Sequence, residues 1–357
     1  MGAETLRNGH LNNFDLIRLA AAVQVMLAHY LTELTPEIHP LITAALHVLP
    51  GVPVFFFISG FLVFASLARS ETVASYAVKR ARRIFPGLWS SVAFGALLVQ
   101  MQHPLPGPEA AALIAAKGTI LQAWNPDALR SYGTGVFNGA LWTIPVELSF
   151  YVALPVVCTL CRRRVDLLLI TLTVLSFAAL TVAAAMPPDM WRKAALLTPV
   201  PWFGMFALGA LAQRHFERLR RYVEDRAILW LTALVAATIP SHFVTLPGLL
   251  ARAGEVPGAG SAMGLVNFGL MAATVLALAH THRDVSSRLL RGNDLSYGIY
   301  LLHMPLLNAA LELGLEAWCW IALPATLILA YLQWRLVEKP VLMRPSSATH
   351  CAPVFAP

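Results

Sequence analysis

FDLIRLAAAVQVMLAHYL, residues 14–31, decides the fold of this chain. The segment is apolar enough to cross a membrane, yet its ionisable side chains include Arg18 and His29. Their separation of 11 positions brings them within about 20° of one helix face, about 16 Å apart along the axis. A charged group at membrane depth costs about 2.5–3.5 kcal/mol even on insertion scales, so it marks a pathway or a reaction site by default. The segment therefore predicts a membrane helix that turns both groups toward one interior cavity.

The composition of the whole chain agrees with a membrane protein. Of its 357 residues, 57% are hydrophobic and 13% are charged, whereas soluble domains average about 25% charged. The formal charge of +7 comes from short basic clusters between apolar segments, which is the pattern of membrane topology rather than of nucleic-acid binding. We therefore expect one lipid-embedded domain, residues 1–340, a disordered cytoplasmic tail, residues 341–357, and no nucleic-acid partner.

Apolar windows of about 20 residues predict an all-α, polytopic bundle of about ten transmembrane helices. They lie near residues 14–32, 49–68, 84–102, 138–160, 166–186, 195–213, 227–246, 262–280, 293–311 and 317–335. Most Lys and Arg residues fall on one side of this bundle, and the other side keeps only Lys117, Arg130, Arg192, Lys193 and Arg252. Because short positive loops stay in the cytoplasm, both termini are predicted to be cytoplasmic. We expect a multi-pass protein of the inner (plasma) membrane.

The sequence gives little indication of a metal site. Its four cysteines form no disulfide framework, and the spacing of Cys158 and Cys161 lacks the second ligand pair that a zinc site needs. We therefore predict no metal and no permanently bound cofactor.

A basic cluster, SYAVKRARRIFPGLW at residues 75–89, precedes the third predicted helix. It has two interpretations. Ordinary positive-inside anchoring explains the charges, whereas a phosphate clamp explains why Arg80 and Arg83 stand three residues apart, on one helix face. Guanidinium groups bind phosphate bidentately, so the second interpretation fits a nucleotide-bearing donor from the cytoplasm.

Two further polar positions lie within predicted helices. Glu147, in GALWTIPVELSFYVALP at residues 139–155, lies about ten residues from the external end and is placed to converge with His29 in the outer half of the membrane. Such a carboxylate needs a partner, a proton or water, and a structural partner is the alternative to a site. Ser296, Tyr300 and His303 form one stripe of a later helix, where an internally hydrogen-bonded histidine suffices.

The external connection, residues 103–137, is long enough to suggest a function. Trp124, Asn125 and Tyr132 suit the stacking and hydrogen bonding of a sugar, although an aromatic belt at the membrane interface is the preferred explanation for any one of them.

Six stretches of the sequence, in this order, resemble the motifs of a known protein family. They are FDLIRLAAAVQVMLAH, GVPVFFFISGFLVF, YAVKRARRIFPGLW, GALWTIPVELSFYVALP, SYGIYLLHMPLL and VEKP. From Phe14 to Pro340 the chain resembles the type-3 membrane acyltransferases, integral-membrane O-acyltransferases that modify surface glycans. The resemblance implies a bundle of about ten helices, an acyl-CoA donor taken from the cytoplasm and an acceptor hydroxyl, usually on a sugar.

The family's motifs fall on particular residues of this sequence. Its basic residue and histidine in the first helix match Arg18 and His29, and its cytoplasmic Arg-x-x-Arg motif matches Arg80 and Arg83. Its tryptophan and glutamate of the fourth helix match Trp142 and Glu147. Many members have a second acidic residue after that glutamate, whereas this chain has Leu148, so a mechanism that needs two adjacent carboxylates is not expected here.

The resemblance implies transfer of an acyl group, most commonly acetyl, from acyl-CoA to a hydroxyl of a cell-surface or lipid-linked polysaccharide, such as exopolysaccharide or lipopolysaccharide O-antigen. In this scheme His29 is the general base and Glu147 orients His29 or the acceptor. Arg18 holds a polar part of the donor or stabilises developing charge, and Arg80 and Arg83 bind the donor's phosphates.

Alternative functions remain. An acyltransferase acting on a small hydrophobic metabolite such as a macrolide differs only in its acceptor. A glycan transporter or flippase also has many helices and buried charges, but the sequence shows no inverted repeat. A covalent acyl-enzyme is disfavoured because no serine or cysteine is paired with His29 in the sequence. The oligomeric state is not indicated.

Overall fold

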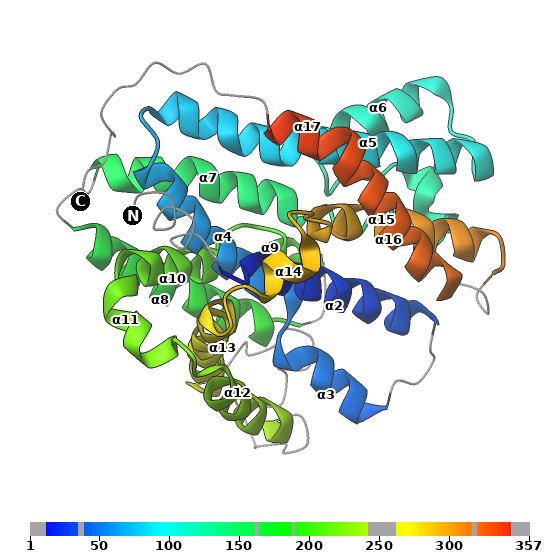
Figure 1. Ribbon diagram of the computed structural model, residues 1–357. Coiled ribbons are helices and arrows are strands. Elements are labelled where there is room, and N and C mark those ends of the chain that lie inside the picture. Colours follow the sequence, from blue (N-terminus) through cyan, green and yellow to red (C-terminus); the bar gives the residue numbers. More distant parts are fainter. Residues whose placement is uncertain are drawn as a thin grey trace. The chain divides into compact units, whose positions relative to one another are not determined.

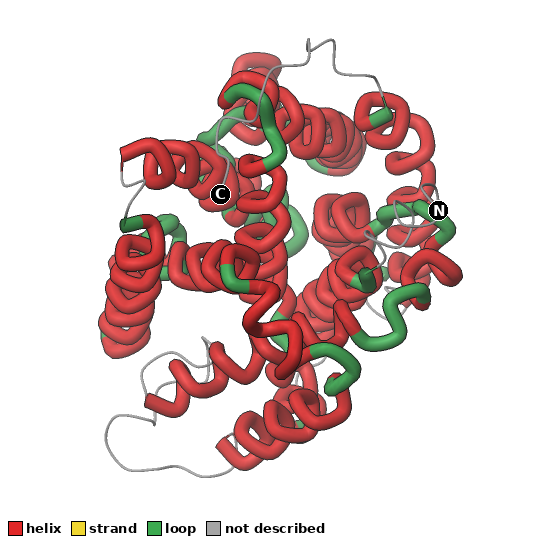
Figure 2. The backbone as a smooth tube through the Cα atoms, turned by 60° about the vertical axis from the view of Figure 1, so that its left-hand side comes forward, coloured by secondary structure: helices red, strands yellow, loops and turns green. Residues whose placement is uncertain are grey.

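A computed structural model describes residues 12–34, 39–160, 164–187, 190–241, 262–315 and 320–343. These residues form helices joined by loops and contain no strand, in agreement with the all-α prediction (Figures 1 and 2). The predictions for Cys161 and for most of the tail, residues 344–357, lie outside the described residues.

Within the described ranges, four helical segments are long and apolar enough to cross a membrane: Phe14–Leu34, Pro40–Ala68, Val73–Gln102 and Val165–Ala183. Three shorter apolar helices accompany them, at Thr143–Thr159, Ala227–Ile239 and Gly264–His280. The chain is therefore a helical membrane protein. The number of about ten spans and the cytoplasmic location of both termini stay predictions.

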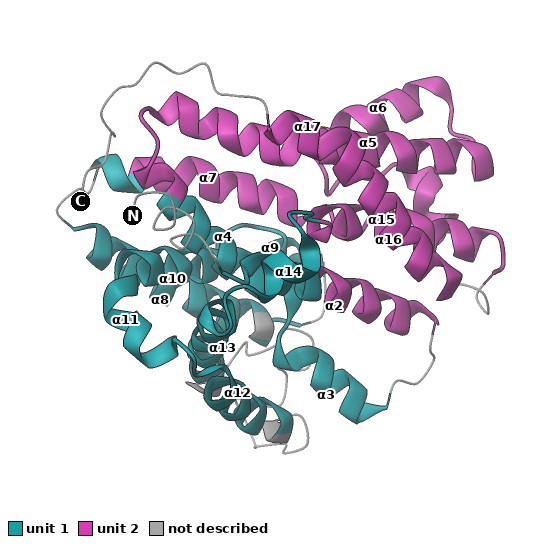
Figure 3. Cartoon of the chain, in the orientation of Figure 1, with its two compact units in different colours: residues 1–21, 39–65, 157–294 teal, residues 22–38, 66–156, 295–357 magenta. Residues whose placement is uncertain are grey.

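The helices divide into two compact units (Figure 3). One unit comprises residues 1–21, 39–65 and 157–294, and the other comprises residues 22–38, 66–156 and 295–357. Three helices continue from one unit into the other: α2 (Phe14–Leu34), α4 (Gly51–Ala68) and α7 (Thr143–Leu160).

The second unit is built around the helix α15 (Ser296–Glu312). The other elements of this unit are α5 (Val73–Gln102), α6 (Gly107–Lys117), η1 (Asp127–Ser131), α16 (Ala322–Gln333), the π-turn η3 (Trp334–Glu338) and α17 (Lys339–Leu342). Most residues of α15 are buried, and α15 packs against both α5 and α16. Gly298 permits this packing, because a Cβ there would lie 2.9 Å from the Cα of Ala330. The side chains of α15 are therefore fixed between two helices.

The helix α5 begins earlier than the sequence predicted. The prediction placed its start near residue 84, but the helix starts at Val73, because Thr72 caps it and forms a capping box with Ser75. The basic cluster thus lies on the first three turns of α5 instead of preceding the helix. Its positive charges extend the helix because Lys and Arg are good helix formers and nothing between residues 73 and 85 breaks it.

The first unit packs helices through small residues. Its remaining helices are α3 (Pro40–Val48), α8 (Val165–Ala185), α9 (Met190–Leu196), α10 (Phe203–Arg214), α11 (Phe216–Val223), α12 (Ala227–Ser241), α13 (Ala262–His280) and α14 (Val285–Leu290). A Cβ at Gly209 of α10 would lie 2.1 Å from the carbonyl oxygen of Phe57 in α4, so the two backbones are in contact there. The single helix predicted for residues 195–213 is wrong, since Pro199 and Pro201 stand between α9 and α10.

Candidate active site

His29 of α2 meets a second histidine. Its Nδ1 lies 2.9 Å from Nε2 of His303 in α15, and the two rings stack with centroids 5.1 Å apart. His303 is fully buried, whereas His29 is partly exposed. The Nδ1 atom of His303 lies 3.0 Å from the carbonyl oxygen of Ile299, one turn earlier in α15. The prediction that His303 is an internally hydrogen-bonded histidine is confirmed, but it did not identify His29 as the partner.

The polar stripe of α15 also anchors the beginning of α7. The hydroxyl of Tyr300 lies 2.8 Å from Oγ1 of Thr143 and donates to the carbonyl oxygen of Ala140, 3.0 Å away. Ser296 is fully buried on the same stripe. The side chains predicted to form one face of this helix therefore do so in the interior of the unit.

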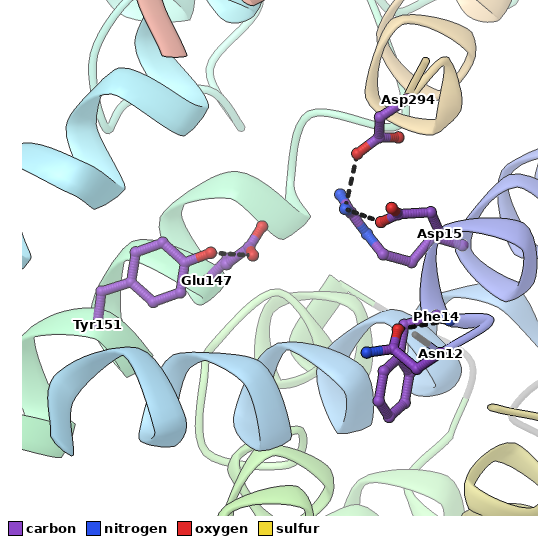
Figure 4. Close-up of polar contacts among 7 residues, drawn as sticks. Asn12, Phe14, Asp15, Glu147, Tyr151 and Asp294 are labelled. Carbon is purple, nitrogen blue, oxygen red and sulfur yellow. Dashed lines mark hydrogen bonds and ion pairs between the residues drawn. The ribbon is translucent and has the colours of Figure 1, made fainter. Parts of the chain in front are cut away.

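Glu147 of α7 accepts a short hydrogen bond from the hydroxyl of Tyr151, one turn later on the same helix (Figure 4). The backbone of Tyr151 is held in turn, because its carbonyl oxygen accepts a bond of 3.0 Å from the hydroxyl of Tyr76. The Nδ1 atom of His29 is bonded to His303, so Glu147 does not occupy that position. Glu147 is thus part of a tyrosine–carboxylate pair.

Arg80 and Arg83 lie half-buried on α5, each over a tyrosine ring. The guanidinium carbon of Arg80 is 5.8 Å from the ring centre of Tyr151, and that of Arg83 is 6.0 Å from the ring centre of Tyr297. One nitrogen of Arg80 also lies 3.4 Å from the hydroxyl of Ser66. Its Nε is buried and has no hydrogen-bond partner among the residues that the structure describes. Arg80 therefore differs from a fully solvated basic residue, because one of its guanidinium donors is buried.

Arg18 forms an ion pair with Asp294, a residue that the sequence analysis missed. The distance from its guanidinium to the Asp294 carboxylate is 2.8 Å, and the carboxylate of Asp15 lies 3.8 Å away (Figure 4). Only 18% of the Arg18 side chain and 10% of the Asp294 side chain are exposed. Asn13 holds the segment that leads to Asp294, since its amide donates to the carbonyl oxygen of Thr281, 2.8 Å away. Arg18 is therefore neutralised within its own unit.

The Arg18–Asp294 pair predicts a large difference between two carboxylate deletions. Asp294→Ala is expected to lower the free energy of unfolding by about 3 kcal/mol, because it leaves a nearly buried guanidinium without its main counter-charge. Asp15→Ala removes an exposed carboxylate from the same arginine and is expected to cost under about 1 kcal/mol. Thermal unfolding of the two variants in detergent measures the difference. Equal unfolding midpoints would contradict the assignment.

A double variant separates the structural role of Arg18 from a role in donor binding. Arg18→Met combined with Asp294→Leu removes both charges and is expected to recover most of the lost stability. If Arg18 also holds the donor, the folded double variant keeps a raised KM for acyl-CoA. A double variant with the wild-type KM would leave Arg18 with the structural role alone.

The connection predicted to be external, residues 103–137, presents fewer groups to a sugar than the sequence suggested. Tyr132 is buried and its hydroxyl donates to the side-chain oxygen of Gln102, 2.9 Å away, and burial followed by the charge of Glu312 raises the pKa of Tyr132 to about 12. The side-chain oxygen of Asn125 accepts from the backbone of Phe137 at 2.9 Å. The predicted sugar contact is therefore wrong for the buried Tyr132, whereas the partly exposed Asn125 contributes a hydrogen bond that holds the loop together.

Two other groups of this connection differ in exposure. Trp124 is 45% exposed, so its ring is accessible. Lys117, at the end of α6, is only 1% exposed and donates to the carbonyl oxygen of Gln122, 2.7 Å away. Burial lowers the pKa of Lys117 to about 8. The segment is therefore folded, and it buries the amino group of Lys117 against its own backbone.

Among the described residues, no group of three or more His, Cys, Asp or Glu side chains is arranged to hold a metal ion. Cys158 is a buried free thiol in α7.

Comparisons with known proteins give the family context of this geometry. The model of the acyltransferase domain matches residues 11–334. Nodulation protein 10 of Rhizobium leguminosarum bv. viciae is 33% identical over 354 residues, covering 94% of each chain. The O-acetyl transferase of Shigella phage Sf6 is 25% identical over 346 residues, covering 94% of this chain and 97% of its own. Acyltransferase MdmB of Streptomyces mycarofaciens is 26% identical over 153 residues, or 41% of this chain and 39% of its own. No solved structure gives a significant match.

Proposed function

We propose, from the fact that this chain belongs to the acyltransferase domain family, that it transfers an acetyl group from acetyl-CoA to a hydroxyl of a cell-surface or lipid-linked polysaccharide. The chain is a membrane O-acyltransferase, and the O-acetyl transferase of phage Sf6 supports acetyl as the transferred group. We place the reaction at the inner (plasma) membrane, where a cytoplasmic donor and a lipid-linked acceptor meet. The observation that carries the proposal is the family match, whose range contains all five candidate residues.

The proposed reaction needs no covalent enzyme intermediate, because a thioester is already activated. The acceptor oxygen attacks the thioester carbonyl carbon while Nε2 of His29 takes the hydroxyl proton. The tetrahedral intermediate then collapses, the carbon–sulfur bond breaks and the coenzyme A thiolate leaves. The protonated His29 returns the proton to that sulfur, so the products are the ester and free coenzyme A.

The arginines supply the donor site in this proposal. The half-buried Arg80 and Arg83 lie on one face of α5, where two guanidinium groups suit the phosphates of acyl-CoA. Arg18 contacts a polar part of the donor or stabilises developing charge, in addition to its ion pair with Asp294.

Glu147 orients the acceptor hydroxyl in this proposal. Its bond to Tyr151 orients the carboxylate, and each carboxylate oxygen can accept more than one hydrogen bond, including one from a sugar hydroxyl. Tyr151 also lies under Arg80, so a tyrosine ring links the proposed donor and acceptor groups.

Purified protein in proteoliposomes tests the reaction directly. With acetyl-CoA labelled in the acetyl group and lipid-linked polysaccharide as acceptor, we expect release of free coenzyme A and label in the polysaccharide. Absence of both acetyl-CoA binding and thiol release would overturn the enzymatic assignment and return the transporter alternative.

Cells with and without the gene identify the acceptor. Mass spectrometry is expected to show polysaccharide that has lost the mass of one C2H2O unit per modified site. Unchanged polysaccharide, together with an acetylated small metabolite that disappears with the gene, would overturn the polysaccharide assignment while leaving the acyltransferase in place.

A further inference from the structure

We infer that His303 is a positioning residue that fixes the tautomer of His29, so that the Nε2 atom of His29 is bare and directed to act as the base. This inference rests on the proposed role of His29. It assigns a function to a histidine that the sequence explained as an interior structural residue.

The hydrogen bonds of His303 determine where its own proton lies. Its Nδ1 faces the carbonyl oxygen of Ile299 at 3.0 Å, and a carbonyl oxygen only accepts, so Nδ1 carries the hydrogen. His303 is fully buried, and a buried imidazolium without a counter-charge is costly. The ring is therefore neutral, and its Nε2 has a lone pair and no hydrogen.

The proton position in His303 determines the proton position in His29. Because Nε2 of His303 is an acceptor, Nδ1 of His29, 2.9 Å away, is the donor in their hydrogen bond. A neutral His29 with a hydrogen on Nδ1 has a bare lone pair on Nε2. The reverse arrangement would put the lone pair of Nδ1 in His303 against the carbonyl oxygen of Ile299. The chain of three groups thus permits one neutral arrangement.

The bare Nε2 is available for chemistry. His29 is partly exposed, and the described residues give its Nε2 no hydrogen-bond partner. The tautomer with hydrogen on Nδ1 is the less common one for a free imidazole, so a histidine left to itself would present Nε2 mainly as a donor. His303 reverses this preference before the acceptor arrives.

The same bond also supports the charged intermediate. When His29 has taken the hydroxyl proton, its Nδ1–H donates to His303 as a charge-assisted hydrogen bond, which is stronger than the neutral one. The third group of a nucleophile–base–orienting triad acts in this way, holding the base in one tautomer and stabilising its imidazolium. Here a neutral imidazole takes the place of the usual carboxylate.

His303 is rigid enough for this role. It lies in the buried centre of α15, between α5 and α16. Its backbone carbonyl oxygen lies 3.4 Å from the hydroxyl of Tyr30, the residue that follows His29. The hydrogen bond between the two rings and the bond from Tyr30 to the backbone of His303 therefore both hold α2 against α15.

Substitutions at His303 test the inference by kinetics. His303→Met keeps the volume and removes the acceptor, and we expect kcat to fall at least about tenfold with the acyl-CoA KM nearly unchanged. His303→Gln places an amide oxygen near the former Nε2, and we expect it to retain kcat within about threefold of wild type. A folded Met variant with the wild-type kcat would overturn the inference, as would a Gln variant as slow as the Met variant.

His280 provides a matched control. It is a buried helical histidine of the first unit, and its Nδ1 lies 2.8 Å from the carbonyl oxygen of Leu276, as in His303, while its ring contacts Phe14, Phe61 and Phe216. His280→Met is expected to change stability but not kcat. A fall in kcat equal to that of His303→Met would show that loss of a buried helical histidine suffices, against the inference.

The tautomer itself is observable without any loss of folding. In wild-type protein labelled with ¹⁵N in the histidine rings, the signals absent from His29→Gln belong to His29. At a pH where His29 is neutral, we expect its Nδ1 to be protonated and its Nε2 to be bare. A protonated Nε2 with a bare Nδ1 in the wild type would overturn the inference.

The experiments distinguish failure of His29 as the base from failure of His303 as the positioning residue. An active His29→Gln variant removes His29 as the base, whatever His303 does. An inactive His29→Gln variant beside a fully active His303→Met variant keeps the base and removes the positioning role. Inactivity of both, with the wild-type tautomer as expected, supports both assignments.

Discussion

Replacing His29 with Gln is expected to reduce acyl transfer by at least about 10²-fold while the protein stays folded. Glutamine has approximately the size of histidine and its amide nitrogen can donate to Nε2 of His303, so the bond that spans 2.9 Å in the wild type keeps a counterpart. It cannot take a proton from the acceptor hydroxyl. Positioned acid–base catalysis contributes about 10²–10⁴-fold, so this loss alone accounts for the expected fall.

Three measurements on the His29→Gln variant distinguish a base from a structural histidine. They are the initial rate of acyl transfer, the binding of acyl-CoA and the thermal unfolding midpoint. We expect donor binding and the unfolding midpoint to stay near wild type, and His29→Ala to be as inactive as His29→Gln. A structural histidine would instead be rescued by Gln. More than about a tenth of the wild-type kcat in His29→Gln would remove His29 from the mechanism.

Replacing Arg80 and Arg83 together with Ala is expected to raise the KM for acyl-CoA by about 10²-fold, with a smaller effect on kcat. Hydrogen bonds to charged groups contribute about 1.5–3 kcal/mol each, and two such losses correspond to about two powers of ten or more. We expect KM rather than kcat to change because these arginines bind phosphates far from the reacting carbonyl. Such contacts stabilise the bound ground state and the transition state equally.

A matched pair of variants separates phosphate binding from topology. Lys79→Ala with Arg82→Ala removes the same charge from the same turns of α5 but leaves the Arg80–Arg83 pair intact, and we expect a KM near wild type. Arg80→Lys with Arg83→Lys keeps the positive charge without the guanidinium fork, and we expect a KM between those of wild type and the double Ala variant. Equal KM values for all three variants would leave the cluster with topology alone.

The sequence by itself determined the fold class and the helices that carry the site. Apolar periodicity is a local property, so the first apolar helix was predicted near residues 14–32 and is found at Phe14–Leu34. The buried polar stripe of α15 followed from spacing alone. The start of α5 was missed because a run of charges lowers hydropathy without breaking a helix, and only the Thr72 cap marks the true beginning.

Tertiary structure alone decided which partners the ionisable groups have. His303 is 274 residues from His29, and Asp294 is 276 residues from Arg18, so neither pairing leaves a trace in local sequence. The sugar contact expected of Tyr132 failed for the same reason, since the burial of Tyr132 depends on which segments cover it. The residue type fixes which hydrogen bonds a side chain can donate or accept, and its position along the helix fixes the face on which it lies. Tertiary packing decides which group it meets. That partner in turn decides the tautomer of a histidine, the counter-charge of an arginine and the atom that stays accessible.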